Sequence, residues 1–285
     1  MAGETKKKSG GSVRPDVASF GGLLLAVGGI LGGLILENGK IRDVAQVTAA
    51  MIVLGGTMGA VMITTPLTIL IGAAKRFGGV FFEHVRSPET VVEEIITFAT
   101  KARKTGIVSL EADVERVADP FLRKALSLAV DGTDIQSLHK MMELEIVLAE
   151  QQAEAEAKVY EAAGGYAPTI GIIGAVLGLI QVMKHLENIE EVGKGIAVAF
   201  VATVYGVGLA NILFLPAAAK IKARMREASR MKELMLEGVS SIAEGLNPKL
   251  IRIRLEAYLH NSPGKPKKVK ADRKAPQAQP VSAEG

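Results

Sequence analysis

The chain has 285 residues, no cysteine, and a formal net charge of +4 at pH 7 from 34 basic and 30 acidic side chains. The absence of cysteine excludes disulfides and thiolate metal sites. The basic excess does not indicate a nucleic acid partner. Most of it lies in the C-terminal tail and beside long apolar segments, where Lys and Arg meet anionic lipid.

Four stretches of 20 or more residues contain no charged side chain, namely Val17–Leu36, 44–74, 162–183 and 195–219. A helix needs about 20 apolar residues to cross about 30 Å of hydrocarbon, so we predict four transmembrane helices. The first stretch is too long for a cleaved signal peptide, and we expect it to be retained. Because none of the four contains an acid, a crossing ion needs a carboxylate from another protein.

Lys and Arg cluster before the first span, after the second and after the fourth, whereas the short connections 37–43 and 184–194 hold two each. The positive-inside rule then puts both termini and the long middle segment in the cytoplasm. Residues 1–16 form a basic N-terminal segment. Residues 260–285 are too polar and proline-rich to bury a core, so we predict a disordered basic tail.

The middle segment carries helix signals rather than strand signals. The starts and ends are, in order, Ser87-Pro88, Gly106, Asp119-Pro120 and Asp131-Gly132. From Asp134 the apolar residues keep helical spacing into the third span, and the fourth span likewise continues into the segment after it. We therefore predict an all-α membrane protein in which two helices extend from the membrane as rods. Its segments are spans one and two in 17–74, a helical cytoplasmic domain at 75–161, spans three and four in 162–219, and cytoplasmic C-terminal helices at 220–259.

Small residues recur at three- and four-residue steps on one face of each of the last two spans. They are Ala167, Gly171, Gly174 and Gly178 in the third span, and Ala199, Thr203, Gly206 and Ala210 in the fourth. Such faces let helix backbones approach closely in lipid. They either pack on each other or form a groove for a helix of another protein, and the spacing leaves both open.

Two prolines, Pro168 and Pro216, lie near the cytoplasmic ends of the third and fourth spans. Each removes a backbone hydrogen bond and is expected to bend its helix. Two bends at one depth also make a candidate hinge between the membrane and the rods.

Catalytic motifs are missing from the sequence, and the four histidines stand far apart. No set of side chains can be assigned the roles of a nucleophile, base and stabilising donor. We therefore predict that the chain is not an enzyme and that it uses no cofactor and no metal.

Six short motifs follow one another along roughly residues 18–259. They are LENG at 36–39, IVLGGT at 52–57, GIVSLE at 106–111, AVDG at 129–132, YAPTIG at 166–171, and the segment 237–248, which begins EG and ends GLNP. In this order they resemble the MotA family of flagellar stator subunits, part of the MotA/TolQ/ExbB proton channel superfamily.

The resemblance implies a subunit of a motor in the bacterial inner membrane. Such subunits form a ring, a pentamer, around the single spans of two MotB-type partners. The partner supplies the ion-binding aspartate and holds peptidoglycan, and ion flow turns the ring against the rotor protein FliG. An energiser of the ExbB/TolQ type or a gliding-machine subunit remains the alternative. A solute transporter and a passive scaffold are competing classes, which the gene of such a partner would exclude.

The resemblance also implies roles for individual residues. Arg103 and Glu111, with Lys104 beside them, are expected to contact the rotor, although alone they read as solvated surface charges. Pro168 and Pro216 match the two prolines linked to conformational coupling. Thr203, Gly171 and Gly178 are expected along the ion path and the partner helix.

The ion itself is predicted from a fourth position on this path, Ala175. Sodium-driven relatives usually have threonine there, so alanine favours protons. Tyr205 and Asn211 resemble sodium-type neighbours instead. We expect protons over sodium.

Overall fold

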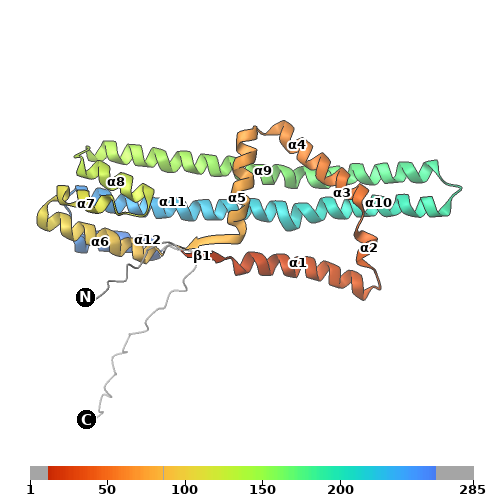
Figure 1. Ribbon diagram of the computed structural model, residues 1–285, viewed down its shortest axis with the longest axis horizontal. Helices are drawn as coiled ribbons and strands as arrows, with labels where there is room; N and C mark the ends of the chain where they lie inside the picture. The colour runs from red at the N-terminus through yellow and green to blue at the C-terminus, as the bar shows by residue number, and fades with distance from the viewer. Residues whose placement is uncertain (1–11, 86, 261–285) are drawn as a thin grey trace, which may run out of the picture.

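The computed structural model describes residues 12–85 and 87–260, and it is an elongated assembly of helices (Figure 1). Among these residues, four helices are long and apolar enough to cross a membrane. They are Val17–Leu36, Val47–Thr64, Ile135–Lys184 and Ile189–Ala243. The predicted all-α fold with four spans is confirmed. The predicted basic segments fall largely before residue 12 and after residue 260, outside the described residues.

Two very long helices form the axis of the molecule. Helix α9 (Ile135–Lys184) has 50 residues, and the continuous helix made of α10 (Ile189–Gly208), the π-helical turn η3 (Leu209–Phe214) and α11 (Leu215–Ala243) has 55. At about 1.5 Å per residue they measure about 75 and about 83 Å, more than twice the hydrocarbon thickness. They lie side by side in opposite directions (Figure 1). The predicted rods are therefore present.

The second apolar stretch, predicted as one span over 44–74, is divided in the structure. Short helices α2 (Ile41–Val44) and α3 (Val47–Ala50), the π-helical turn η1 (Met51–Gly55) and α4 (Gly56–Thr64) precede the break. Thr65 is extended (φ −132°, ψ 131°) because the proline that follows it disfavours the helical region. Helix α5 (Leu67–Phe81) then runs across the long helices (Figure 1). The predicted boundary of the membrane part at residue 74 therefore falls inside α5.

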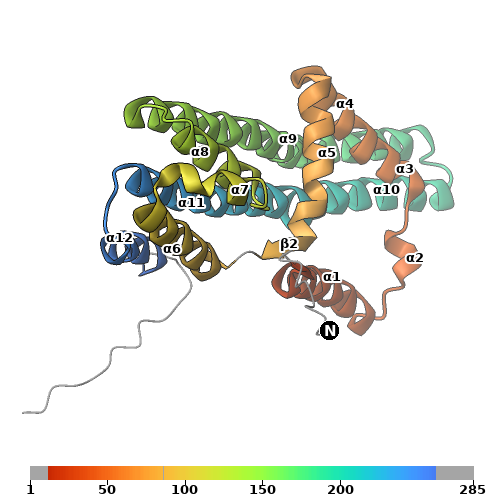
Figure 2. The ribbon, with the colours of Figure 1, turned by 60° about the vertical axis from the view of Figure 1, so that its left-hand side comes forward.

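A short antiparallel ribbon, which the sequence did not predict, joins β1 (Ser12–Pro15) to β2 (Phe82–Val85). Its register pairs Ser12 with Val85 and Pro15 with Phe82. The ribbon fixes the start of the first span, α1 (Val17–Leu36), beside the end of α5. Apart from this anchor and a close approach to η3, α1 stands away from the long helices (Figure 2), and it has no buried residue.

The inserted helices form a second packed region, which we call the distal domain. It consists of α6 (Pro88–Thr105), η2 (Ile107–Leu110), α7 (Glu111–Val114), α8 (Pro120–Val130), α12 (Pro248–His260) and the adjoining ends of α9 and α11. The predicted start at Asp119 is confirmed, since its carboxylate accepts the backbone N–H groups of Phe121 and Leu122 at 2.9 and 3.1 Å.

The core of the distal domain is a cluster of apolar side chains. Its fully buried side chains include Ile95, Leu110, Leu126, Met142 and Leu255. Burial of apolar surface contributes about 25 cal/mol per Å², and it stabilises short helices that would not be stable alone in water. The distal domain is therefore a packed end piece on the two rods.

Candidate functional site

The predicted rotor-contact residues lie together at one corner of the distal domain. Arg103 and Lys104 occupy the last turn of α6, and Glu111 begins α7; all three are exposed. The corner forms because Gly106 has φ 83°, a left-handed conformation that glycine adopts without strain and that ends α6. Figure 1 shows the α6–α7 corner at the end of the rods farthest from the α9–α10 turn.

Side-chain bonds brace this corner. The hydroxyls of Thr105 and Ser109 lie 2.7 Å apart, and Ser109 Oγ donates to the Gly106 carbonyl at 2.7 Å. Lys101 Nζ contacts Asp113 Oδ2 at 2.6 Å across the same turn. The charged side chains therefore project from a backbone that is held in place by hydrogen bonds and an ion pair.

In the spans, the small-residue faces of α9 and α10 pack directly on each other. A Cβ added to Gly171 would lie 2.9 Å from the Ala202 carbonyl oxygen, and one added to Gly206 would lie 2.5 Å from that of Ala167. Gly178 meets Gly195 O in the same way, at 2.7 Å. Packing is thus the arrangement within the chain, and Gly171 and Gly178 set the spacing of the two helices.

The other predicted ion-path residues, Ala175 and Thr203, are half-buried. Thr203 Oγ1 donates to Ala199 O at 3.1 Å, one turn back in its own helix, a common bond for threonine in a membrane helix. Tyr205 is bound elsewhere, since its hydroxyl donates to Val44 O at 2.5 Å and accepts from the Gln46 N–H at 3.3 Å. It therefore ties the fourth span to the start of the second.

The predicted coupling residues sit in helices that continue through them. Pro168 lies inside α9 and is half-buried, and Pro216 is the second residue of α11, directly after η3. Proline cannot donate to the carbonyl four residues before it, and the wider π-helical turn is where the helix accommodates this loss. The fourth span thus changes its helical winding where it meets α11.

Two ionic clusters near this level were missed by the sequence analysis. Glu156 of α9 is only 3% exposed and pairs with Arg76 of α5, and Gln152 Nε2 also donates to its carboxylate at 3.2 Å. Asp16, directly before α1, contacts Lys220 Nζ at 2.5 Å and Arg224 Nη2 at 2.8 Å. One feature of the sequence could have indicated these ion pairs. The acid and the base of each pair lie at similar distances from the ends of predicted spans, although they belong to separate segments of the chain.

The Asp16 cluster, which consists of Asp16, Lys220 and Arg224, strongly favours the charged form of the Asp16 carboxyl. The hydrogen bond from Lys220, together with the Ser19 N–H and Arg224, holds the pKa of the Asp16 carboxyl well below its usual range. Arg224 also donates to the backbone carbonyls of Phe82 and Val80. The cluster therefore connects α1, the end of α5 and α11.

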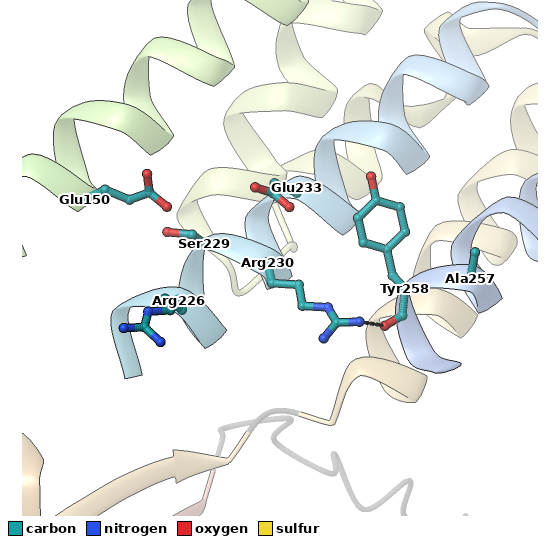
Figure 3. A pocket seen from close by; sticks show the side chains of 7 residues that line it. All are labelled: Glu150, Arg226, Ser229, Arg230, Glu233, Ala257 and Tyr258. Carbon is teal, nitrogen blue, oxygen red and sulfur yellow. Dashed lines mark hydrogen bonds between the residues drawn. The ribbon is translucent and has the colours of Figure 1, made fainter. Parts of the chain in front are cut away.

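A hollow of about 500 Å³ lies between α9, α11 and α12 in the distal domain (Figure 3). Two acids and two arginines line it, and Arg230 donates to the Tyr258 carbonyl at 2.5 Å. Its lining contains none of the predicted site residues. The mixed charges fit a solvated seam between helices.

Comparison with known proteins places this architecture in one family. Residues 20–106 match the family model described as Motility protein A N-terminal, and residues 113–234 match the MotA/TolQ/ExbB proton channel family. Motility protein A of Bacillus subtilis (strain 168) is 36% identical over 248 residues, which cover 86% of this chain and 91% of that protein.

Two solved structures have the same fold. A C. jejuni MotAB structure matches with a TM-score of 0.82 and 31% identity, covering 88% of this chain and 99% of the matched one. The flagellar MotAB stator complex from Bacillus subtilis matches with a TM-score of 0.78 and 34% identity, covering 85% and 95%. The chain therefore belongs to the motility protein A (MotA) family, whose members are channel and motor subunits rather than enzymes.

Proposed function

We propose that this chain is a stator subunit of the bacterial flagellar motor. With a MotB-type partner it forms an ion channel that converts ion flow into torque on the rotor protein FliG. The observation that carries the proposal is the match, over nearly the whole chain, to two MotAB complexes. The match of residues 20–106 to the motility protein A N-terminal model favours a stator over an ExbB/TolQ-type energiser.

The ion path requires the partner because the four charge-free stretches, 17–36, 44–74, 162–183 and 195–219, contain no acid. A partner aspartate carries the ion past the half-buried Ala175 and Thr203. The methyl group of Ala175 offers no oxygen to a dehydrated cation, which favours protons over sodium. One charge crossing the membrane potential yields about 2.3 kcal/mol per 100 mV, enough to bias a conformational step.

The rods carry that step away from the membrane. Pro168 and Pro216 provide places where α9 and the helix before α11 can change direction. Tight contacts between Gly171, Gly178 and the facing helix keep the two spans moving as one unit. A small rotation in the membrane is thereby transmitted to the distal domain.

At the distal corner, Arg103, Lys104 and Glu111 meet opposite charges on FliG. Exposed pairs give orientation and speed of contact rather than high affinity, which suits a contact that is made and broken at every step. In this proposal the chain assembles as a pentameric ring in the inner membrane, with both termini and the distal domain in the cytoplasm, as the flanking basic residues indicate.

The test is the swimming speed of a stator-deletion strain that carries this chain and its partner. Sodium concentration and the proton potential are varied separately. We expect speed to follow the proton potential and to be insensitive to sodium at constant potential. Speed that depends on sodium would overturn the ion assignment. If the deletion strain swims normally without any second stator, the motor assignment is wrong.

A further inference from the structure

A slot of about 360 Å³ separates α1 from the rest of the chain near the start of the first span. Apolar side chains dominate its lining, including Leu23 and Ala26 of α1, Phe77 and Phe81 of α5, and Leu213 of η3. Since α1 has no buried residue, this face of the helix is left uncovered by its own chain. The slot lies within the depth of the membrane, because α1 is a span.

The slot is too narrow for another helix. Helix α1 approaches both α5 and η3 to within 8 Å between Cα atoms. The rings of Phe20 and Phe81 are 5.3 Å apart between centroids at its base. A helix with its side chains is about 10–12 Å across, so it cannot enter between elements this close. A single hydrocarbon chain is a suitable occupant.

The end of the slot nearest the distal domain is positively charged. Lys220 lines it, and Asp16 and Arg224 adjoin Lys220. One carboxylate faces two cations, so the cluster keeps one net positive charge. Lys220 Nζ has three N–H donors, and its bond to Asp16 occupies one of them.

The cluster stands at the level of lipid headgroups, since α1 begins at Val17, the residue after Asp16. A net positive charge above an apolar slot matches the two ends of an anionic phospholipid. We infer that the slot is a binding site for one anionic phospholipid, with an acyl chain between α1, α5 and η3 and the phosphate at Lys220. Pro216 also lines the slot, so the lipid would contact the proposed hinge. The inference requires only that the chain spans a membrane, not that it drives a motor.

The test uses the complete complex with its partner in nanodiscs that contain equal amounts of phosphatidylglycerol and phosphatidylcholine. After mild detergent extraction, native mass spectrometry counts the lipids that stay bound. One uncompensated cation near the membrane surface favours the anionic lipid by about fivefold. We expect phosphatidylglycerol to be retained over phosphatidylcholine by this factor.

Two variants of α1 form a matched pair at one depth. Gly22 lines the slot and Gly21 does not, and both have open space where a Cβ would be added. Gly22→Leu should fill the slot and lose the bound lipid, whereas Gly21→Leu should retain it. Equal retention in the two variants would overturn the site. So would an efficient disulfide, formed with an added oxidant, between two neighbouring copies that both carry Gly22→Cys, since a second chain would then cover the slot.

Charge variants keep the proposal testable even if Gly22→Leu fails to assemble. Lys220→Gln leaves one anion and one cation, so the preference for phosphatidylglycerol should disappear. Asp16→Asn leaves two cations, so the preference should increase. If neither change alters the ratio of the two lipids, the charged end of the slot does not hold a headgroup and the inference is wrong.

Discussion

Arg76 of α5 pairs with Glu156 of α9, and Glu156 is only 3% exposed between these two helices. Glu156 also lies so close to Gly72 that a Cβ there would come 2.4 Å from Oε1. A second bond, from Tyr160 OH to Ala73 O at 2.8 Å, joins the same two helices. Helix α5 is therefore fastened across α9 by buried polar contacts as well as apolar ones.

Removing the arginine should destabilise the chain. In Arg76→Ala a buried carboxylate keeps its desolvation penalty without its charged donor, so we expect a loss of about 2 kcal/mol in the free energy of unfolding. The measurement is unfolding of the purified chain in detergent. Arg252→Ala is the control, because its pair with Glu93 is exposed and should matter little. If the two substitutions lowered the free energy of unfolding equally, the burial of Glu156 would not increase the stability that its ion pair contributes.

The contact between the last two spans should be intolerant of added volume. Gly206→Ala puts a methyl group 2.5 Å from a backbone carbonyl that cannot rotate away, so α9 and α10 must separate at a cost of about 1–3 kcal/mol. Gly208→Ala, two residues further along, meets open space and is the control. The abundance of each variant in the membrane and its melting temperature in detergent are compared. A Gly206→Ala variant as stable as the Gly208→Ala variant would contradict the packing.

Local rules of sequence predicted much of this fold. Charge-free length found the four spans, and capping residues such as Asp119 and Gly106 marked helix ends correctly, because these signals act within a few residues. The charge-free length of 44–74 predicted one span, whereas α4 ends at Thr64 because Pro66 disfavours a helical conformation at Thr65.

Contacts between distant segments could not be predicted in the same way. The ribbon at Ser12 and the partners of Asp16 and Glu156 depend on which elements meet in space, and no local pattern specifies that. The small-residue faces illustrate the same limit. Their spacing showed that something packs closely at Gly171, and only the fold identified the neighbour as Ala202.

Charge reversal at the distal corner should reduce torque without lowering abundance. Single exposed pairs are worth about 0.2–1 kcal/mol, so Arg103→Glu or Glu111→Arg alone should weaken swimming and the double reversal should nearly abolish it. Arg123→Glu, an exposed charge on α8, is the control. Single-motor torque and membrane abundance are measured together. Normal torque in the double variant would remove both residues from the rotor contact.

The Asp16 cluster should make stability depend on pH in one direction. The folded-state pKa of the Asp16 carboxyl is lowered. The stability that the charged carboxylate contributes is therefore present above its unfolded pKa of about 3.9, and it is lost as the pH falls through the folded-state pKa. Asp16→Asn should therefore be less stable than the wild type at pH 7. The difference should persist to about pH 4 and shrink only below it. Melting temperatures of the two proteins in detergent across this range provide the measurement, and a constant difference down to the most acid pH would contradict the assignment.

The half-buried Ala175 should control which ion is used. Ala175→Thr adds a hydroxyl oxygen to the proposed path, and an oxygen ligand favours a dehydrated cation more than it favours a proton. We expect torque in this variant to gain a dependence on sodium or to fall at constant proton potential. Ala175→Val adds similar volume without an oxygen, so it separates coordination from crowding. If threonine and valine reduce proton-driven torque equally and neither responds to sodium, the position limits space and does not select the ion.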